Sequence, residues 1–162
     1  MWFAVSVDNA AILAMTAQHG DTLVPDGERL LEQGVRSSSL YVLVSGVLDV
    51  QRRGRTVAQM DEPGALVGEM GLLLQAPASA DVIAVGETRV RRLHDAVELF
   101  ERNPDFSRFV ATMLAQRLLE ISSYLSDLQE QFADRADILG LVPTVVAHAA
   151  DFSPSGRRLS RS

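Results

Sequence analysis

The chain has 162 residues, of which 47% are hydrophobic and 22% charged, a composition typical of one globular domain and unlike that of disordered chains. Its formal net charge is −6 and all fifteen cationic residues are Arg, so the basic footprint of a nucleic-acid-binding domain is lacking and direct DNA binding is not expected. It has no Cys and no apolar stretch of the roughly twenty residues that cross a bilayer, which excludes disulfides and predicts a cytoplasmic protein without a membrane partner.

The first element predicted along the chain is a short helix within an N-terminal segment of residues 1–20. Asp8 can cap this helix by accepting hydrogen bonds from the free N–H groups of its first turn. Apolar residues, among them Ile12 and Leu13, then fall near one face. The pattern predicts that the helix continues to about Gln18.

Residues 21–102 carry short apolar runs separated by turn residues at close intervals, which is typical of an all-β roll or barrel. Most runs alternate apolar and polar residues, as half-buried strands do. The sequence predicts seven strands, at residues 23–24, 29–32, 40–44, 47–51, 56–60, 81–85 and 88–93. The hairpin tip at residues 52–55 carries three Arg, which indicate either a solvated turn or an anionic partner.

A long helix is predicted next, over residues 103–140. Asn103 can cap it, Pro104 suits its first turn, and Asp105 complements the positive end of the helix dipole. Apolar residues then recur at spacings of four and three, as in a coiled-coil seam, at Leu114, Leu118, Ile121, Leu125, Leu128 and Phe132. At about 50 Å the helix is longer than the roll can cover, so the seam predicts a homodimer. The alternative is that the N-terminal helix or residues 141–150 cover it.

The sequence predicts that Gly140 and Pro143 end this helix, and that residues 141–162 form a partly mobile extension. A DNA-binding helix-turn-helix would need on the order of 60 further residues after the helix, more than this extension provides. This length is a second reason to expect no direct DNA binding.

Catalysis is not predicted. His19, His94 and His148 lie far apart in the sequence and none has a predicted partner, so we expect no metal of the kind that some β-roll enzymes bind through clustered His and Glu. The sequence has neither a Walker loop nor a supported Ser–His–Asp order. We therefore expect no catalytic residues and no metal.

Two segments of the predicted roll carry a specific motif. Residues 25–50 read PDGERLLEQGVRSSSLYVLVSGVLDV, with Gly27, Gly34 and Gly46 at predicted turns, and residues 64–82 read GALVGEMGLLLQAPASADV. In order and spacing they resemble the cyclic-nucleotide-binding domain family, with the second segment similar to the phosphate-binding cassette of that family.

This resemblance covers about residues 18 to 135 and implies an α+β fold. The expected fold is an antiparallel, jelly-roll-like β-roll with a short N-terminal helix and a long C-terminal helix. In bacterial members related to the catabolite activator protein, that long helix dimerises.

The cassette implies a site for cAMP, cGMP or a related nucleotide. Glu69 can accept a hydrogen bond from the ribose 2′-hydroxyl, and Gly68 lets the backbone approach the sugar. A helical turn from Met70 would direct free N–H groups toward the phosphate, to which Ser79 adds a hydroxyl and an N–H. The expected ligand residues, with one from the long helix near the base, are Gly68, Glu69, Met70, Ala78, Ser79, Ala80 and Ser122.

Ala78 departs from the family pattern, which has an Arg between the Pro and the Ser or Thr. A charge-assisted contact of this kind contributes roughly 1.5 to 3 kcal/mol, about ten- to more than a hundredfold in affinity. A replacement could come from the following strand, which carries Arg89, Arg91 and Arg92.

Two hypotheses about function follow. In the first, the chain is a non-catalytic regulatory module that binds a cyclic nucleotide weakly or atypically and signals through a dimeric long helix. In the second, the pocket is degenerate, Glu69 only satisfies the backbone of the cassette, and the chain acts as a ligand-independent dimerising adaptor. The sequence does not identify the downstream partner in either case.

Overall fold

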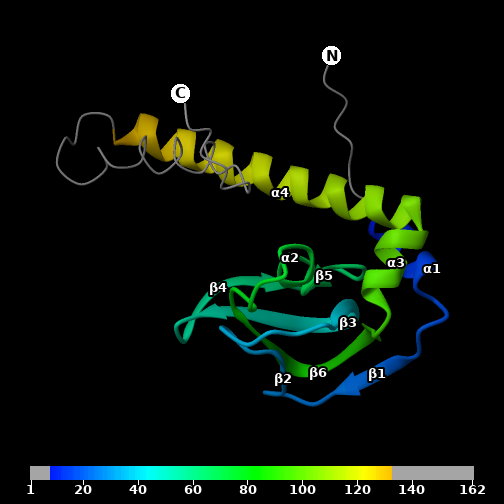
Figure 1. The fold of residues 1–162 in the computed structure, drawn as a ribbon. Helices are drawn as coiled ribbons and strands as arrows, with labels where there is room; N and C mark the ends of the chain where they lie inside the picture. Colours follow the sequence, from blue (N-terminus) through cyan, green and yellow to red (C-terminus); the bar gives the residue numbers. More distant parts are fainter. Residues whose placement is uncertain (1–7, 133–162) are drawn as a thin grey trace, which may run out of the picture. The chain divides into compact units, whose positions relative to one another are not determined.

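The structure is a computed structural model that describes residues 8–132 (Figure 1). The chain divides into two compact units, Met1–Met113 and Leu114–Ser162. The predicted helix end at Gly140 and the extension 141–162 lie outside the described residues. Within the described range, no helix is both long enough and apolar enough to cross a membrane.

The N-terminal helix, α1, spans Asn9–Met15. The predicted cap is confirmed, because the Asp8 carboxylate accepts a hydrogen bond from the Ala10 N–H at 3.0 Å. The helix ends earlier than predicted because Thr16 is its C-cap, and the Thr16 hydroxyl donates to the Ile12 carbonyl at 2.7 Å. Ile12 is fully buried and anchors the helix within the first unit.

Six strands form one antiparallel sheet that is rolled up on itself (Figure 1). The two long strands organise it: β6 pairs with β1, β2 and β3, and β3 pairs in addition with β4 and β5. The strand bounds are Asp21–Val24 for β1, Arg29–Leu31 for β2, Leu40–Arg52 for β3, Arg55–Met60 for β4, Leu66–Val67 for β5 and Asp81–Leu93 for β6. The predicted antiparallel roll is confirmed.

The two long strands join segments that the sequence predicted as four separate strands. Gly46 lies in the middle of β3, where the pairing with β6 shifts register on either side of Ser45. Gly46 has φ +94°, and a Cβ there would lie 2.8 Å from both the Glu87 carbonyl oxygen and the Thr88 Cα. Gly46 therefore lets β3 bend closely past β6 without interrupting the strand.

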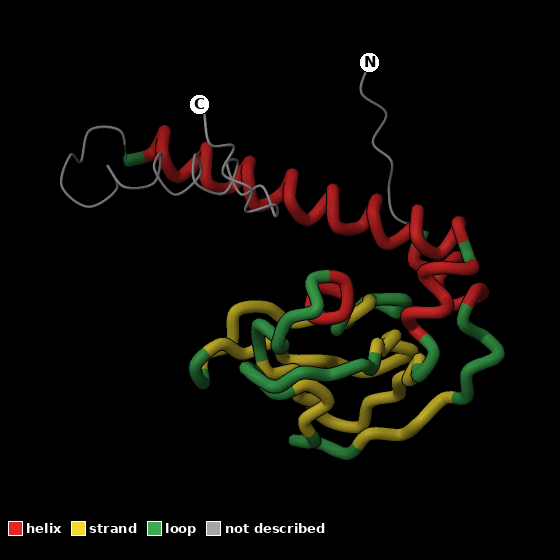
Figure 2. Tube along the Cα trace, in the orientation of Figure 1, coloured by secondary structure: helices red, strands yellow, loops and turns green. Residues whose placement is uncertain are grey.

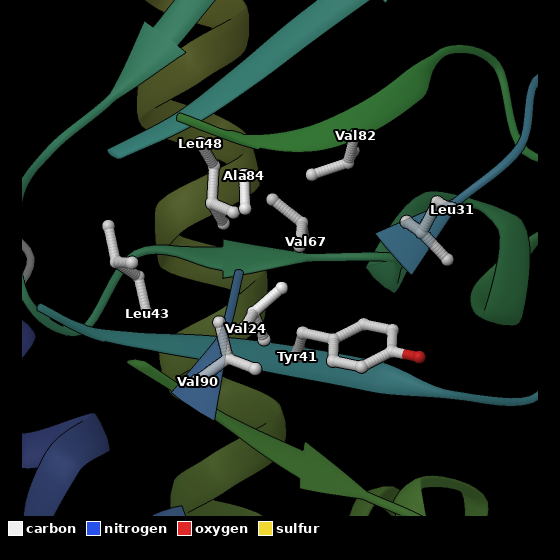
Figure 3. Packing of buried hydrophobic residues seen from close by; sticks show 9 residues of the cluster. All are labelled: Val24, Leu31, Tyr41, Leu43, Leu48, Val67, Val82, Ala84 and Val90. Carbon is white, nitrogen blue, oxygen red and sulfur yellow. The ribbon is translucent and has the colours of Figure 1, made fainter. Parts of the chain in front are cut away.

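The core of the roll is an apolar cluster with members from five of the six strands (Figure 3). Its side chains point toward one another from Val24, Leu31, Tyr41, Leu43, Leu48, Val67, Val82, Ala84 and Val90. Fully burying a Val or Leu side chain stabilises a fold by roughly 1.5 to 3 kcal/mol. We call these nine residues the core cluster; they define the inner face of the roll.

Three helices follow the early strands: α2 (Glu69–Leu73), α3 (Ala96–Arg102) and α4 (Pro104–Gln131). Figure 2 shows α2 as a short helical turn among the strands and loops of the roll. The predicted start of α4 is confirmed, because the Asn103 side-chain oxygen accepts a hydrogen bond from the Phe106 N–H at 3.0 Å. The sequence did not predict α3 or β5.

Candidate functional site

The cassette, residues 64–82, begins its turn at Gly68. This residue is the N-cap of α2 and has φ +97°, and a Cβ there would lie 2.7 Å from the Ser39 carbonyl oxygen. A side chain at this position would push the cassette away from the start of β3. The glycine therefore keeps the next residue against the roll, and Glu69 is only 3% exposed.

The end of the cassette folds back against α2. The Ala76 N–H donates to the Gly71 carbonyl at 3.0 Å, and Ala78 then exchanges hydrogen bonds with the β2–β3 connection. In that exchange the Ala78 N–H donates to the Val35 carbonyl at 2.9 Å, and the Gly34 N–H donates to the Ala78 carbonyl at 2.9 Å. These bonds fix residues 76–78 between α2 and the turn that follows β2.

Six of the seven predicted ligand residues lie at the two ends of this folded cassette. Gly68, Glu69 and Met70 lie at the start of α2, while Ala78, Ser79 and Ala80 immediately precede β6. Met70 and Ser79 are exposed, whereas Ala80 is buried. Ser122 is exposed on the part of α4 that belongs to the second unit.

Ala78 contributes no polar side chain to the cassette. Its methyl group is half-buried and packs against the core cluster. The cassette itself therefore offers backbone groups, the Ser79 hydroxyl and the Glu69 carboxylate, without a cation at the position where the family pattern has one.

The Arg residues of β6 that sequence reasoning proposed as replacements have other contacts. Arg91 forms an ion pair with Asp21, with 2.6 Å between Arg91 Nε and Asp21 Oδ1. Arg92 donates from Nε to the Ser39 hydroxyl at 2.9 Å, and its guanidinium lies 5.8 Å from the ring centroid of Tyr41. Arg89 pairs in register with residues of β1 and β3. Arg91 and Arg92 thus direct their side chains at these partners and not at residues 78–80.

A different Arg, which sequence reasoning assigned to the hairpin tip, contacts the cassette. Arg52 is the last residue of β3, and its Nε–H donates to the Ser79 carbonyl oxygen at 3.0 Å. The signal that could have identified it is the pairing of β3 with β6, which no local sequence pattern gives. Arg52 is the residue that the sequence analysis missed at this site.

A second polar cluster lies on β3 and β4. Asp49 is 6% exposed and accepts hydrogen bonds from the Gln51 amide at 2.6 Å, the Thr56 hydroxyl at 2.8 Å and the Gln59 amide at 3.5 Å. These bonds, that of Gln51 most strongly, lower the pKa of Asp49 from its ordinary value of 3.8. The neighbouring side chains thus satisfy this carboxylate. Among residues 8–132, no group of three or more His, Asp or Glu is arranged to hold a metal ion.

The predicted seam of α4 contains exposed apolar side chains. Leu118 is 65% exposed and Ile121 57%, and the other four seam residues are half-buried: Leu114, Leu125, Leu128 and Phe132. Two further large side chains on the same stretch, Leu119 and Tyr124, are 67% and 63% exposed and were not predicted as part of the seam. The apolar surface of α4 is thus wider than a heptad seam.

Comparison with known proteins finds relatives that match part of the chain. The chain is 35% identical over 105 residues to the cyclic AMP receptor protein of Thermus thermophilus, which covers 60% of this chain and 48% of that protein. It is 31% identical over 110 residues to the Pycsar effector protein XpPycTIR of Xanthomonas perforans, which covers 66% of this chain and 36% of that protein. The chain thus spans about half or less of the length of these two relatives.

The fold is also similar to that of a solved structure of this group of proteins. The crystal structure of the Thermus thermophilus catabolite activator protein superposes with a TM-score of 0.61 at 29% identity, covering 78% of this chain and 62% of that chain. The model of the family described as cyclic nucleotide-binding domain matches residues 22–102, which hold the whole roll from β2 to β6 and the cassette. Because this match covers half of the 162-residue sequence, the chain belongs to the cyclic nucleotide-binding domain family.

Proposed function

We propose that this chain is a non-catalytic regulatory module that binds cAMP or cGMP in its cassette and signals through α4. The observation that carries the proposal is the pair Gly68–Glu69, in which a left-handed glycine holds a buried carboxylate against the roll. In the family pattern, a carboxylate at this position of the cassette accepts a hydrogen bond from the ribose 2′-hydroxyl.

Each end of the cassette has its own role in this proposal. Glu69 accepts a hydrogen bond from the ribose 2′-hydroxyl, and Gly68 and Met70 bring the backbone of the turn close to the sugar and phosphate. Ser79 donates its hydroxyl and N–H to the phosphate, with Ala78 and Ala80 as its apolar neighbours.

The signalling step rests on α4. A ligand shifts a conformational equilibrium only by its differential affinity for the two states, so nucleotide binding must favour one arrangement of the helix. The exposed Leu118 and Ile121 support a homodimer, since an apolar helix face of this kind is typical of an interface. Occupancy of the cassette would then be communicated to the partner through the paired helices.

A second candidate function has its own supporting observation. Ala78 packs its methyl group against the core cluster, so the cassette lacks the cation that its family pattern uses for the phosphate. This favours an adaptor that dimerises without a ligand. In that case Glu69 has only a structural role.

Calorimetric titration of the purified protein with cAMP and with cGMP tests the two candidates. We expect saturable heat with one of the two nucleotides, and an affinity that is stronger by about tenfold or more in the Ala78→Arg variant. If neither nucleotide gives heat or a thermal shift at millimolar concentration, in the wild type or in Ala78→Arg, the adaptor is correct and nucleotide sensing is not.

A further inference from the structure

The pairing of β3 with β6 brings the end of β3 to the end of the cassette. The register is constant from Val47 to Gln51, and Gln51 lies opposite Asp81. The next residue along β3, Arg52, therefore lies beside Ala80, where the cassette joins β6. This position is set by the sheet and does not depend on the conformation of the hairpin tip.

The alternation of side chains along β3 gives the direction of Arg52. Leu48 belongs to the core cluster and Val50 packs against it. Because every second residue of a strand faces the same side, Arg52 follows Leu48 and Val50 on the inner face of the roll. Its aliphatic stem thus starts on the apolar side of the sheet, beside Ala80, which immediately precedes β6 and is 8% exposed.

The guanidinium of Arg52 contacts the cassette. Its Nε–H donates to the Ser79 carbonyl oxygen at 3.0 Å. A guanidinium has five N–H donors in a fixed plane, and the bond to Ser79 uses one of them. This planar fork matches the oxygens of a phosphate.

We propose that Arg52 binds the cyclic phosphate in place of the Arg that the cassette lacks at Ala78. The inference rests on the proposed function, since it assigns the cation to the same phosphate that Ser79 contacts. The bond from Nε to the Ser79 carbonyl holds the guanidinium next to the Ser79 N–H and hydroxyl. The cation therefore comes from β3, across the sheet, and the phosphate lies between it and the cassette backbone.

The neighbouring Arg53 provides a matched control. It lies on the same hairpin tip and carries the same charge, but it is in the turn, with φ 52°, and its N–H donates to the Gln33 side-chain oxygen at 2.9 Å. This bond ties the Arg53 backbone to the β2–β3 connection. Replacing Arg53 thus removes the same charge from the same tip without removing the contact with Ser79.

The test is calorimetric titration of the wild type, Arg52→Gln and Arg53→Gln with cAMP and cGMP. We expect Arg52→Gln to weaken binding of the preferred nucleotide by about ten- to a hundredfold, the size of one charge-assisted hydrogen-bonded contact. Arg53→Gln should change it by only a small factor, because solvent and salt screen the charge of an exposed tip. Thermal denaturation of the unliganded variants should show unchanged folding, since the Arg52 side chain is exposed.

A rescue variant makes the assignment sharper. In Arg52→Gln, adding Ala78→Arg should restore the lost affinity, because the second cation approaches the same phosphate from the cassette side. Equal losses in Arg52→Gln and Arg53→Gln, or an unchanged affinity in Arg52→Gln, would overturn the role of Arg52 while nucleotide binding stands. If the wild type binds neither nucleotide, the proposed function fails and this inference fails with it.

Discussion

Asp49 and Glu69 are the two acidic residues that the roll buries within the described range, and their surroundings give them different roles. Three neighbouring side chains donate hydrogen bonds to the Asp49 carboxylate, which thereby helps to join β3 to β4. Glu69 instead lies at the turn of the cassette, held there by the close approach of Gly68 to Ser39. Burial alone thus does not distinguish a binding carboxylate from a structural one, and we propose Glu69 as the binding carboxylate because of its position on the cassette.

Replacing Glu69 with Gln tests its role in the proposed function. The variant keeps the size of the side chain and removes the charge, so we expect cAMP binding to weaken by about tenfold or more, as a charged acceptor of the 2′-hydroxyl is lost. Calorimetry measures the change, and Glu87→Gln, at an exposed position, is the control. Binding of 2′-deoxy-cAMP should be equal in Glu69→Gln and the wild type; an equal loss for both nucleotides would show that Glu69 has a structural role only.

Asp49 gives a prediction about pH. Its pKa is lowered in the folded state, so its carboxylate stabilises the fold above the ordinary pKa of 3.8, and this contribution disappears as the pH falls through the folded pKa. We therefore expect the difference in melting temperature between the wild type and Asp49→Asn to shrink from about pH 6 to about pH 3. Asp61→Asn, at an exposed acid near the end of β4, controls for the loss of one charge. Parallel curves for the wild type and Asp49→Asn would contradict this account.

The need for a glycine at the bend of β3 can be measured as a change in the free energy of unfolding. Gly46→Ala combines a left-handed backbone with a Cβ that would lie 2.8 Å from Thr88, so we expect a loss of about 2 to 4 kcal/mol in the free energy of unfolding. Gly86→Ala is the matched control, because Gly86 has φ +66° and open space around it, and should cost about 1 kcal/mol. Urea denaturation measures both. Equal losses of unfolding free energy in the two variants would show that the close approach of β3 to β6 at Gly46 does not contribute to stability.

Gly46 also explains why the sequence predicted too many strands. Glycine is a strong local sign of a turn, whereas the hydrogen bonds that carry β3 across it come from β6, far along the chain. The two elements that were not predicted are short. In α3 the N-cap Asp95 makes no side-chain capping bond, and β5 has only two residues, too few to show alternation. The caps Asp8 and Asn103 were predictable because a cap involves only the next few residues.

The candidate site also has a part that the sequence predicts and a part that it does not. The cassette could be predicted because its turn and short helix are contiguous, so their residue types appear together in the sequence. Arg52 lies 27 positions from Ser79, and only the register between β3 and β6 brings the two residues together. A contact set by sheet pairing leaves no local pattern, and the basic tip was therefore interpreted as a solvated turn or a site for an anionic partner.

At the scale of the whole molecule, the apolar surface of α4 has the largest consequence. Leu118, Leu119, Ile121 and Tyr124 are all more than half exposed. Removing apolar surface from water stabilises an assembly by roughly 25 cal/mol for each Å² that is buried. Two copies of the helix could bury these side chains against each other, and a symmetric interface would double each contact.

The double variant Leu118→Gln with Ile121→Gln tests the proposed dimer. Both side chains are exposed, so we expect the variant to fold as the wild type does and to be monomeric at micromolar concentration, while the wild type is dimeric. Light scattering on a size-exclusion column measures the mass, and Glu120→Gln on the same helix is the control that should stay dimeric. A wild type that is monomeric under these conditions would contradict the dimer.

Coupling between the dimer and the cassette can be measured with the same variants. If nucleotide binding signals through the paired helices, cAMP must change the dissociation constant of the dimer, and by linkage dimerisation must change the affinity for cAMP by the same factor for each site. A typical coupling of this kind is about fivefold or more. We therefore expect the monomeric double variant to bind cAMP with an affinity that differs from that of the wild-type dimer by such a factor. Because Leu118 and Ile121 lie outside the cassette, equal affinities would mean that nucleotide binding and dimerisation are independent, and that α4 does not carry the signal.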